Sequence, residues 1–420
     1  MNLSELKKEE IKDKNTNNKP SFIDKLTKNQ NLKKILFIKI VIVIILIPIF
    51  LFLTSQKINN NLIFNNEEKK SEEITSTQHL LSPTPTPTPI PKKYYNPING
   101  EEIPEERFLQ IQNRPVLAVI VQNHVESRPQ AGINEADLVY ETLVESGITR
   151  FMFIYWQNDT NRIQSIRSVR KYFIELLGEY NNPVLMHIGY ATGSSDVNAI
   201  DAMNRYQVRR LSDLTDKETR EYSFTRDIEC QRIKAMEHCA WSDTARLWRI
   251  ASQYGFTSDI NQLQTWIFAE ERHNNVNNNS IEKESIEINF SGTKDDYSSV
   301  WRYNKEDGFY YRVDPRSGNN YTDYNGQPVK TKTLIVQGIK SYYNGDSKGR
   351  IVQEVIGKGD GYILENGKIT KVIWQKDSYN SKTRYFFAEN PSQEYIFERG
   401  KKWIILVPNT SLLTLYNQYF

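Results

Sequence analysis

The stretch VLAVIVQNHVESRPQAG, residues 116–132, decides how this chain of 420 residues is organised. Its first six residues are all apolar, which predicts a buried strand. Asn123, His124 and Arg128 follow directly, although a simple turn needs none of these side chains. Because α/β folds place ligand-contacting side chains at the carboxyl ends of their strands, we expect these three residues to form one wall of a pocket.

The segments after this strand alternate between strand and helix patterns. Ser146-Gly147 lies between two β-rich runs, which predicts a hairpin with a two-residue loop, and Ser168 can cap an amphipathic helix. The predicted elements are strands at 138–145, 149–156 and 184–188 and helices at 169–180, 196–205 and 242–254. The pattern predicts an α+β fold whose first domain, residues 96–260, is α/β-like.

Beyond a polar break at residues 272–280, the pattern changes to strands alone. The strand-rich runs are SVWRYNKEDGFYYRV (299–313), TLIVQGI (333–339), RIVQEVI (350–356), GYILENGKITKVIW (361–374) and EYIFERGKKWIILVP (394–408). Turn signals at Asn366-Gly367 and Arg399-Gly400 divide two of these runs. We therefore expect a second, mostly β domain over residues 280–420.

The N-terminal part of the sequence predicts a membrane anchor. Residues 35–53, ILFIKIVIVIILIPIFLFL, would span roughly 28 Å as a helix, close to the thickness of a bilayer's hydrocarbon core. Lysines concentrate before this run, so we expect residues 1–34 to be a polar cytoplasmic tail and everything after the span to lie outside the cell membrane. A cleaved signal peptide is the alternative, but the charged region ahead is long and no A-x-A cleavage site follows. Residues 54–95 end in SPTPTPTPIPKK, which predicts a disordered stalk.

Composition excludes some functions and leaves others open. A net charge of +3 is small for this length, so the sequence does not predict nucleic-acid binding. Cys230 and Cys239 would be roughly 13 Å apart on one helix, too far for a disulfide, so we expect free thiols unless the segment bends. The sequence has neither CxxC nor HExxH, and we expect no metal and no cofactor.

The predicted hairpin brings charged residues together. With a two-residue loop, Arg150 would have Glu141 and Glu145 as diagonal neighbours on one face of the sheet. Such a face is either the polar floor of a site or an ordinary solvated surface.

Arg167, Arg170 and Lys171 form a second cationic group at the predicted start of a helix. Cations there oppose the helix dipole, at a cost of about 0.3–1 kcal/mol each. A bound anion would remove this conflict, since free backbone N–H groups and arginines both favour negative charge. The alternative is that these arginines point to water or pair with Glu141 or Glu145.

Three histidines and one carboxylate are the candidates for chemistry. His124 follows a buried strand, His187 lies within an apolar run, and His238 precedes a helix. A lone histidine on a strand is more often a packed core residue than a catalyst. Glu141 (or Asp137) could act as a general base if it is buried. The sequence shows no clear nucleophile, and the loop around Ser194 lacks the GxSxG pattern.

At these residues the chain resembles the YerB-like family of bacterial lipoproteins, which carry a domain of unknown function. The matching motifs are Arg114-Pro115, Asn123-His124, Arg128-Pro129-Gln130-Ala131-Gly132, Ala136-Asp137, Tyr140-Glu141, Gly147-Ile148-Thr149-Arg150, Ile166-Arg167-Ser168-Val169-Arg170, His187-Ile188-Gly189 and Glu237-His238-Cys239-Ala240. The resemblance covers roughly residues 95–410 and continues weakly in the β-rich part. It implies this architecture and an extracytoplasmic setting, but no reaction.

The chain also departs from the family's pattern. No lipobox cysteine follows Leu53, so the resemblance would make this chain a member held by its helix. Cys239 stands where the family usually has asparagine, which puts in doubt any role for an amide beside His238.

Together these observations predict a single-pass, outward-facing cell-envelope protein. We expect its ligand-binding residues to be Asn123, His124, Arg128, Arg150, Arg167 and Arg170, and its ligand to be an anionic envelope polymer such as peptidoglycan or a phosphate-bearing glycan. The alternative is a non-catalytic module that docks on envelope proteins. Convergence of the histidines and arginines in a pocket would favour the first, and scattered positions the second.

Overall fold

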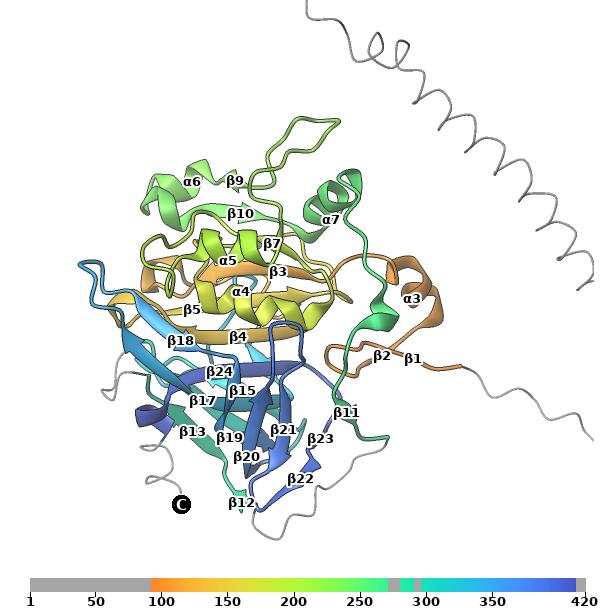
Figure 1. Cartoon of the computed structure of the whole chain (residues 1–420), viewed down its shortest axis with the longest axis vertical. Coiled ribbons are helices and arrows are strands. Elements are labelled where there is room, and N and C mark those ends of the chain that lie inside the picture. The colour runs from red at the N-terminus through yellow and green to blue at the C-terminus, as the bar shows by residue number, and fades with distance from the viewer. Residues whose placement is uncertain (1–91, 271–279, 291–295, 413–420) are drawn as a thin grey trace, which may run out of the picture. The chain divides into compact units, whose positions relative to one another are not determined.

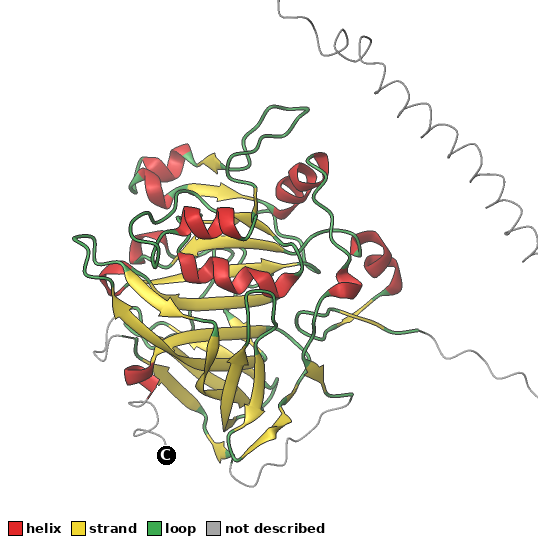
Figure 2. Cartoon of the chain, in the orientation of Figure 1, coloured by secondary structure: helices red, strands yellow, loops and turns green. Residues whose placement is uncertain are grey.

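The computed structural model describes residues 92–270, 280–290 and 296–412 (Figure 1). The predicted cytoplasmic tail, the predicted transmembrane helix at 35–53 and all but the end of the predicted stalk lie outside these residues. Within the described ranges, no helix has both the length and the apolar character needed to cross a membrane. The described chain mixes helices and strands, and its C-terminal part consists mostly of strands (Figure 2).

One large mixed sheet forms the centre of the molecule. In sheet order its strands are β22 (Asn390–Glu394), β21 (Arg384–Phe387), β20 (Lys368–Lys376), β19 (Gly357–Glu365), β17 (Thr333–Tyr343), β24 (Lys402–Pro408), β4 (Leu138–Leu143), β5 (Thr149–Tyr155), β3 (Leu117–Gln122), β7 (Val184–Met186) and β8 (Arg209–Arg210). Two further strands join it, β12 (Ile281–Glu282) on β20 and β18 (Ile351–Glu354) on β17.

Strand β24 joins the two predicted domains within this sheet. It lies parallel to β17 on one side and parallel to β4 on the other. Its residues Trp403, Ile404 and Ile405 are buried, as expected for a strand with both faces covered. The sheet therefore continues from the α/β-like part into the β-rich part.

Helices and smaller sheets cover both faces of the large sheet. The helices are α3 (Glu105–Ile111), α4 (Lys171–Leu177), α5 (Ala199–Arg205), α6 (Ile228–Gln231) and α7 (Thr244–Gln253), with single 3₁₀ turns at Val125–Ser127, Glu145–Gly147, Gly178–Tyr180, Met236–His238 and Ile260–Gln262. The smaller sheets pair β1 (Tyr94–Tyr95) with β2 (Glu102–Ile103), β11 (Ile267–Phe268) with β23 (Ile396–Phe397), β10 (Ala240–Ser242) with β6 (Ile163–Gln164) and β9 (Thr225–Arg226), and β13 (Ser285–Ile288), β14 (Ser299–Asn304), β15 (Phe309–Val313) and β16 (Lys330–Thr331) in order.

Alternate residues along the strands pack into two cores. Ala118 and Ile120 of β3 join the core that α3, α4 and α5 cover, and Figure 1 shows α4 and α5 over this part of the sheet. Leu117 and Val119 belong to the core on the opposite face, under α7 and the sheet β13 to β16. Because both faces are covered, β3 is buried at every position, as its apolar run predicts.

Two local predictions need correction. Ser168 caps no helix, because α4 begins only at Lys171 and its first turn has no side-chain cap. The predicted turn at Arg399-Gly400 does not join two paired strands, because β23 pairs with β11 while β24 enters the large sheet. The predicted turn at Asn366-Gly367 is confirmed: both residues have positive φ, and β19 and β20 pair directly on either side.

The hairpin between β4 and β5 is also confirmed, but its register differs by one residue. Its loop is Glu145–Gly147, so Arg150 lies opposite Thr142 and Leu143 opposite Thr149. Because side chains alternate along a strand, a shift of one residue turns Glu141 and Arg150 to opposite faces of the sheet. The predicted grouping of these two residues on one face is therefore wrong.

Candidate functional site

The carboxyl ends of β3 and β7 are held apart by the segment 165–170. Gln122 N–H donates to Ser165 O at 3.0 Å, and Arg167 N–H donates to Ile120 O at 2.9 Å. On the other side of the segment, Ile188 N–H donates to Arg167 O at 3.0 Å. The segment thus carries its arginines to the strand ends of the parallel pair, where α/β sheets place their ligand sites.

Arg150 and Arg170 converge on one residue of this segment, Ser168. Arg150 Nη1 donates to Ser168 O at 2.8 Å and contacts its Oγ at 3.3 Å. Arg170 Nη1 donates to Ser168 Oγ at 3.0 Å. Gln122 is the cross-strand partner of Arg150 and lies on the same face of the sheet. We call these residues, with His124, Arg167 and His238, the strand-end cluster.

The two converging arginines differ in how their charge is balanced. Arg170 forms a bidentate ion pair with Glu145, with 2.7 Å from Nε to Oε1 and 2.6 Å from Nη2 to Oε2. Burial alone would lower the pKa of Arg170, but the bond to Glu145 outweighs it and raises this pKa. No described carboxylate forms an ion pair with Arg150, whose Nε is buried without a partner. Burial, aided by Arg170, lowers the pKa of Arg150 to about 9.

Arg167 connects the arginines to the histidines. Its Nη2 lies 3.5 Å from Glu237 Oε1, while its Nε is buried without a hydrogen-bond partner. Burial lowers the pKa of Arg167. The cluster therefore holds two buried guanidinium nitrogens, Arg150 Nε and Arg167 Nε, that have N–H groups to donate and no acceptor within the described residues.

His124 and His238 stack on each other, with ring centroids 5.0 Å apart and 20° between their planes. His238 Nδ1 accepts a hydrogen bond from the Gln122 amide at 2.7 Å, and its Nε2 lies 3.0 Å from Glu126 Oε2. Burial and the neighbouring His124 lower the pKa of His238. Two histidines that are far apart in the sequence thus meet in the cluster.

His187 lies beside the cluster at the end of β7. Its Nδ1 is 2.8 Å from Gly189 O, and its buried Nε2 has no partner within the described residues. Burial lowers the pKa of His187. The segment next to it in the sheet is Arg167-Ser168, but no described contact links the His187 ring to the arginines.

Asn123, Arg128 and Glu141 belong to a different, buried network on the opposite face. The Glu141 carboxylate accepts hydrogen bonds from both terminal guanidinium nitrogens of Arg312, at 2.7 and 2.8 Å. Thr149, Ser299 and Trp403 complete its hydrogen bonds. Asn123 donates to Thr149 Oγ1 at 2.7 Å and accepts from Arg128 Nε at 3.1 Å. These bonds tie β4 and β5 to β14, β15 and β24, and they leave Glu141 enclosed by donors.

Four residues of the site were not singled out from the sequence as ligand contacts: Gln122, Glu126, Ser168 and Glu237. The face of Gln122 follows from strand alternation, because Ile120 and Ala118 precede it at spacings of two. Nothing in the local pattern indicates the roles of the other three.

Cys230 and Cys239 form a disulfide, so the expected free thiols are wrong and the alternative, a bent segment in which the two pair, is confirmed. The helix α6 ends at Gln231 and the chain turns back, which brings the two Cα atoms within 5.6 Å. The bridge closes the segment that contains His238, a member of the strand-end cluster.

Removing this disulfide should loosen the closed segment. By the loop-entropy relation, a loop of this size contributes about 2–3 kcal/mol. The double variant Cys230→Ser with Cys239→Ser should therefore be cut by trypsin after Arg232 or Lys234 at least tenfold faster than the oxidised wild type, as mass spectrometry of early fragments would report. Equal cleavage rates at these two residues would show that the bridge does not hold the segment.

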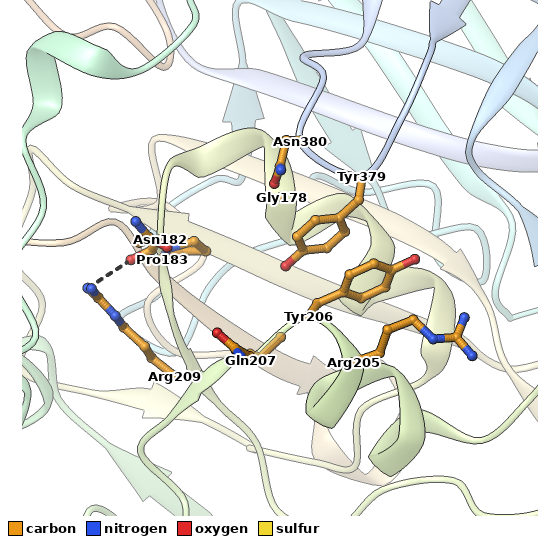
Figure 3. Close-up of a pocket in the computed structure, with 10 residues that line it drawn as sticks. Gly178, Asn182, Pro183, Arg205, Tyr206, Gln207, Arg209, Tyr379 and Asn380 are labelled. Carbon is orange, nitrogen blue, oxygen red and sulfur yellow. Dashed lines mark hydrogen bonds between the residues drawn. The ribbon is translucent and has the colours of Figure 1, made fainter.

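The described residues also form a pocket of about 320 Å³ away from the cluster (Figure 3). It lies between the β7–β8 edge and the loop after β20, and Tyr206 and Tyr379 stack in it with centroids 3.8 Å apart. The other lining residues are Gly178, Asn182, Pro183, Arg205, Gln207, Val208, Arg209 and Asn380. None of the predicted site residues lines this pocket. A second, of about 490 Å³, lies beside β14 and β15.

Comparisons with known proteins agree with this architecture. The N-terminal domain model of the "Protein of unknown function (DUF3048)" family matches residues 100–257, and its C-terminal domain model matches residues 286–404. "Putative lipoprotein YerB" of Bacillus subtilis (strain 168) is 25% identical over 325 residues, which are 76% of this chain and 87% of YerB.

The crystal structure of the YerB protein from Bacillus subtilis has the same fold. It superposes with a TM-score of 0.60 at 22% identity, over 76% of this chain and 98% of the YerB chain. The two matched domain models together cover the α/β-like part, with the strand-end cluster, and most of the β-rich part. The chain therefore belongs to the YerB-like DUF3048 family, as its motifs indicate.

Proposed function

We propose that this chain is an extracytoplasmic cell-envelope protein that binds an anionic group in the strand-end cluster. The observation that carries the proposal is Arg150, which is 7% exposed and has no ion-pair partner among the described residues. A buried charge without a counter-ion is costly, so such a side chain is retained where a ligand supplies the opposite charge. Arg167 adds a second unpartnered donor.

Two observations support the location. The relative YerB carries the name "Putative lipoprotein", and lipoproteins are held at a membrane surface. The disulfide between Cys230 and Cys239 suits an oxidising compartment outside the cytoplasm. In this proposal residues 35–53 anchor the chain by a single pass, with the N-terminus in the cytoplasm.

The ligand class follows from the compartment and from the donors. Guanidinium groups form their strongest paired hydrogen bonds with carboxylates and phosphates. Peptidoglycan carries carboxylates, and phosphate-bearing glycans carry phosphates. The cluster contains no hydroxyl or thiol paired with a base in the way a nucleophile requires, so the proposal is for binding and not for a reaction.

Binding of the full-length protein to purified peptidoglycan and to a polyglycerol-phosphate polymer tests the proposal. Arg167→Ala should weaken binding about tenfold, which corresponds to about 1.4 kcal/mol and to the lower end for a charge-assisted bond. Arg232→Ala is the matched control, because Arg232 also pairs with a glutamate but is exposed. Equal losses in both variants would indicate bulk electrostatic attraction and would contradict the proposal.

A second candidate function is docking on an envelope protein. Large apolar side chains are exposed on the segment closed by the disulfide and just before it: Ile228 69%, Ile233 81% and Met236 55%. Exposed apolar residues that gather on one segment are typical of protein contacts. Ile233→Ser would abolish recruitment to such a partner while leaving polymer binding intact. Loss of polymer binding in this variant would argue against a separate docking surface.

A further inference from the structure

The stacked histidines are the basis for a second site beside the arginines. Within the described residues, His124, Glu126 and His238 each offer one ligand atom, and these atoms lie within 4.8 Å of one another. We propose that these three side chains bind a divalent cation of the zinc type. Imidazole nitrogens and a carboxylate oxygen are ligands that Zn²⁺ prefers, and three protein ligands leave the fourth position open for water or a substrate.

The distances suit one shared ion. His238 Nε2 and Glu126 Oε2 are 3.0 Å apart. Two ligands of a tetrahedral zinc ion, each about 2.0–2.1 Å from it, lie roughly 3.4 Å apart. Binding therefore requires this pair to open slightly and the His124 ring to move toward it, from ligand atoms that already lie within 4.8 Å of one another. Glu126 has the freedom to adjust, because its side chain is 60% exposed.

The most constrained ligand is His238. Its side chain is 6% exposed, and Gln122 holds its Nδ1 so that Nε2 points to Glu126. The disulfide at Cys239 restrains the backbone next to it. Glu126 lies in the turn after β3, Val125–Ser127, and His124 directly precedes this turn, while His238 ends a second short turn, Met236–His238. The two turns therefore hold the three ligand side chains near one another, and binding requires no change in the strands of the sheet.

One set of hydrogen bonds has to change when the ion binds. The Gln122 amide nitrogen lies 3.2 Å from Glu237 O and 2.7 Å from His238 Nδ1, so it donates to both. In the metal-free protein the ring proton of a neutral His238 is therefore on Nε2, toward Glu126. His124 has the same tautomer, because its Nδ1 accepts from Glu126 N–H at 3.3 Å. Metal binding through His238 Nε2 moves the ring proton of His238 to Nδ1, so Gln122 must turn its oxygen toward His238. Binding through His124 Nε2 would likewise break the hydrogen bond from Glu126 N–H to His124 Nδ1.

The need for Gln122 to turn when the ion binds suggests a substitution at this residue that tests the proposal directly. Metal-binding histidines usually donate their second ring N–H to a carboxylate or a carbonyl. Gln122→Glu would place a carboxylate beside His238 Nδ1 and remove the amide donor that opposes metal binding. The variant should bind Zn²⁺ about tenfold more tightly than the wild type, within the 10–100-fold range of second-shell effects.

The experiment is a titration of ZnCl₂ into the chelator-treated full-length protein. We expect one Zn²⁺ per chain, with affinity at least about 100-fold lower in His238→Ala and in His124→Ala and about tenfold lower in Glu126→Gln. Glu229→Gln, an exposed carboxylate on α6, and His187→Ala are the matched controls and should bind as the wild type does. Cobalt substituted for zinc should show visible absorption that disappears in the same three ligand variants.

The outcomes separate this site from the anion site. Arg167→Ala should bind zinc at least as tightly as the wild type, because Arg167 contributes no ligand and its positive charge opposes a cation near His238. The metal proposal is overturned if the folded wild type binds no zinc, or if His238→Ala and His187→Ala bind it equally. Melting curves of the metal-free variants identify any that fail to fold, and the gain expected for Gln122→Glu still tests the proposal in that case. Failure of polymer binding leaves these results unaffected.

Discussion

Arg312→Met is expected to lower the free energy of unfolding by about 3–5 kcal/mol, the usual result of leaving one partner of a buried ion pair uncompensated. The Arg312 guanidinium and the Glu141 carboxylate meet through two hydrogen bonds, with side chains 5% and 0% exposed. Four aromatic rings surround the guanidinium, those of Phe151, Trp301, Tyr321 and Trp403. Water cannot replace the lost charge at Glu141 without opening this core.

Chemical denaturation of the full-length protein measures the effect. The double variant Glu141→Gln with Arg312→Met should recover part of the loss, because it removes both charges and leaves a neutral amide for the bonds of Ser299 and Trp403. Arg316→Met is the control, since Arg316 is 49% exposed and its ion pairs are long, at 3.5 and 3.7 Å. Surface changes of this kind shift stability by about 0.5 kcal/mol or less. If Arg312→Met and Arg316→Met lose the same stability, the pair of Glu141 and Arg312 does not hold the α/β-like part and the β-rich part together.

The sequence predicts those parts of this fold that depend on local patterns. The apolar run before Gln122 is a buried strand, and Asn366-Gly367 forms a hairpin because both residues adopt positive φ at little cost. The order of strands in the sheet depends on pairing between distant segments. β24 lies between β17 and β4, whose paired residues precede it by about 70 and 260 positions, and no local feature of Lys402–Pro408 identifies these neighbours.

The sequence predicts the site only in part, because local patterns indicate some of its residues while others depend on contacts between distant segments. The end of an apolar strand and the IRSVR segment indicate where a pocket could lie, and the structure places Arg150, Arg167 and Arg170 together there. The face on which Glu141 lies depends on the length of one loop, and an error of one residue assigned it to the wrong side. Its true partner, Arg312, follows 171 positions later, which no pattern around Glu141 indicates. The disulfide required knowing that α6 stops after one turn.

Arg150→Met is expected to have opposite effects on stability and on binding, and this separates a ligand-binding arginine from a structural one. The methionine side chain is apolar and of similar length, so it fills the space of the arginine without a charge. Arg150 has no direct ion pair, and Glu145, the carboxylate that attracts its charge, is already bound to Arg170. Removing this poorly balanced charge should raise the stability of the ligand-free protein by about 1–2 kcal/mol. At the same time the anionic polymer loses a charge-assisted hydrogen bond, so binding should fall about 10–150-fold, or by about 1.5–3 kcal/mol.

Thermal unfolding and polymer binding, measured on the same preparation, test both effects. A gain of this size should raise the melting temperature by about 2–4 °C. Arg170→Met is the matched control, because it removes a neighbouring arginine that is bound to Glu145 and leaves that carboxylate half-buried without its partner. It should therefore lose stability where Arg150→Met gains it. The two arginines share Ser168 as an acceptor, and Ser168 keeps one donor in either variant, so the difference in sign reports on the bond between Arg170 and Glu145, which Arg150 lacks. A lower melting temperature for Arg150→Met would mean that the protein itself neutralises this guanidinium, and the anion site would then have no unbalanced charge to offer a ligand.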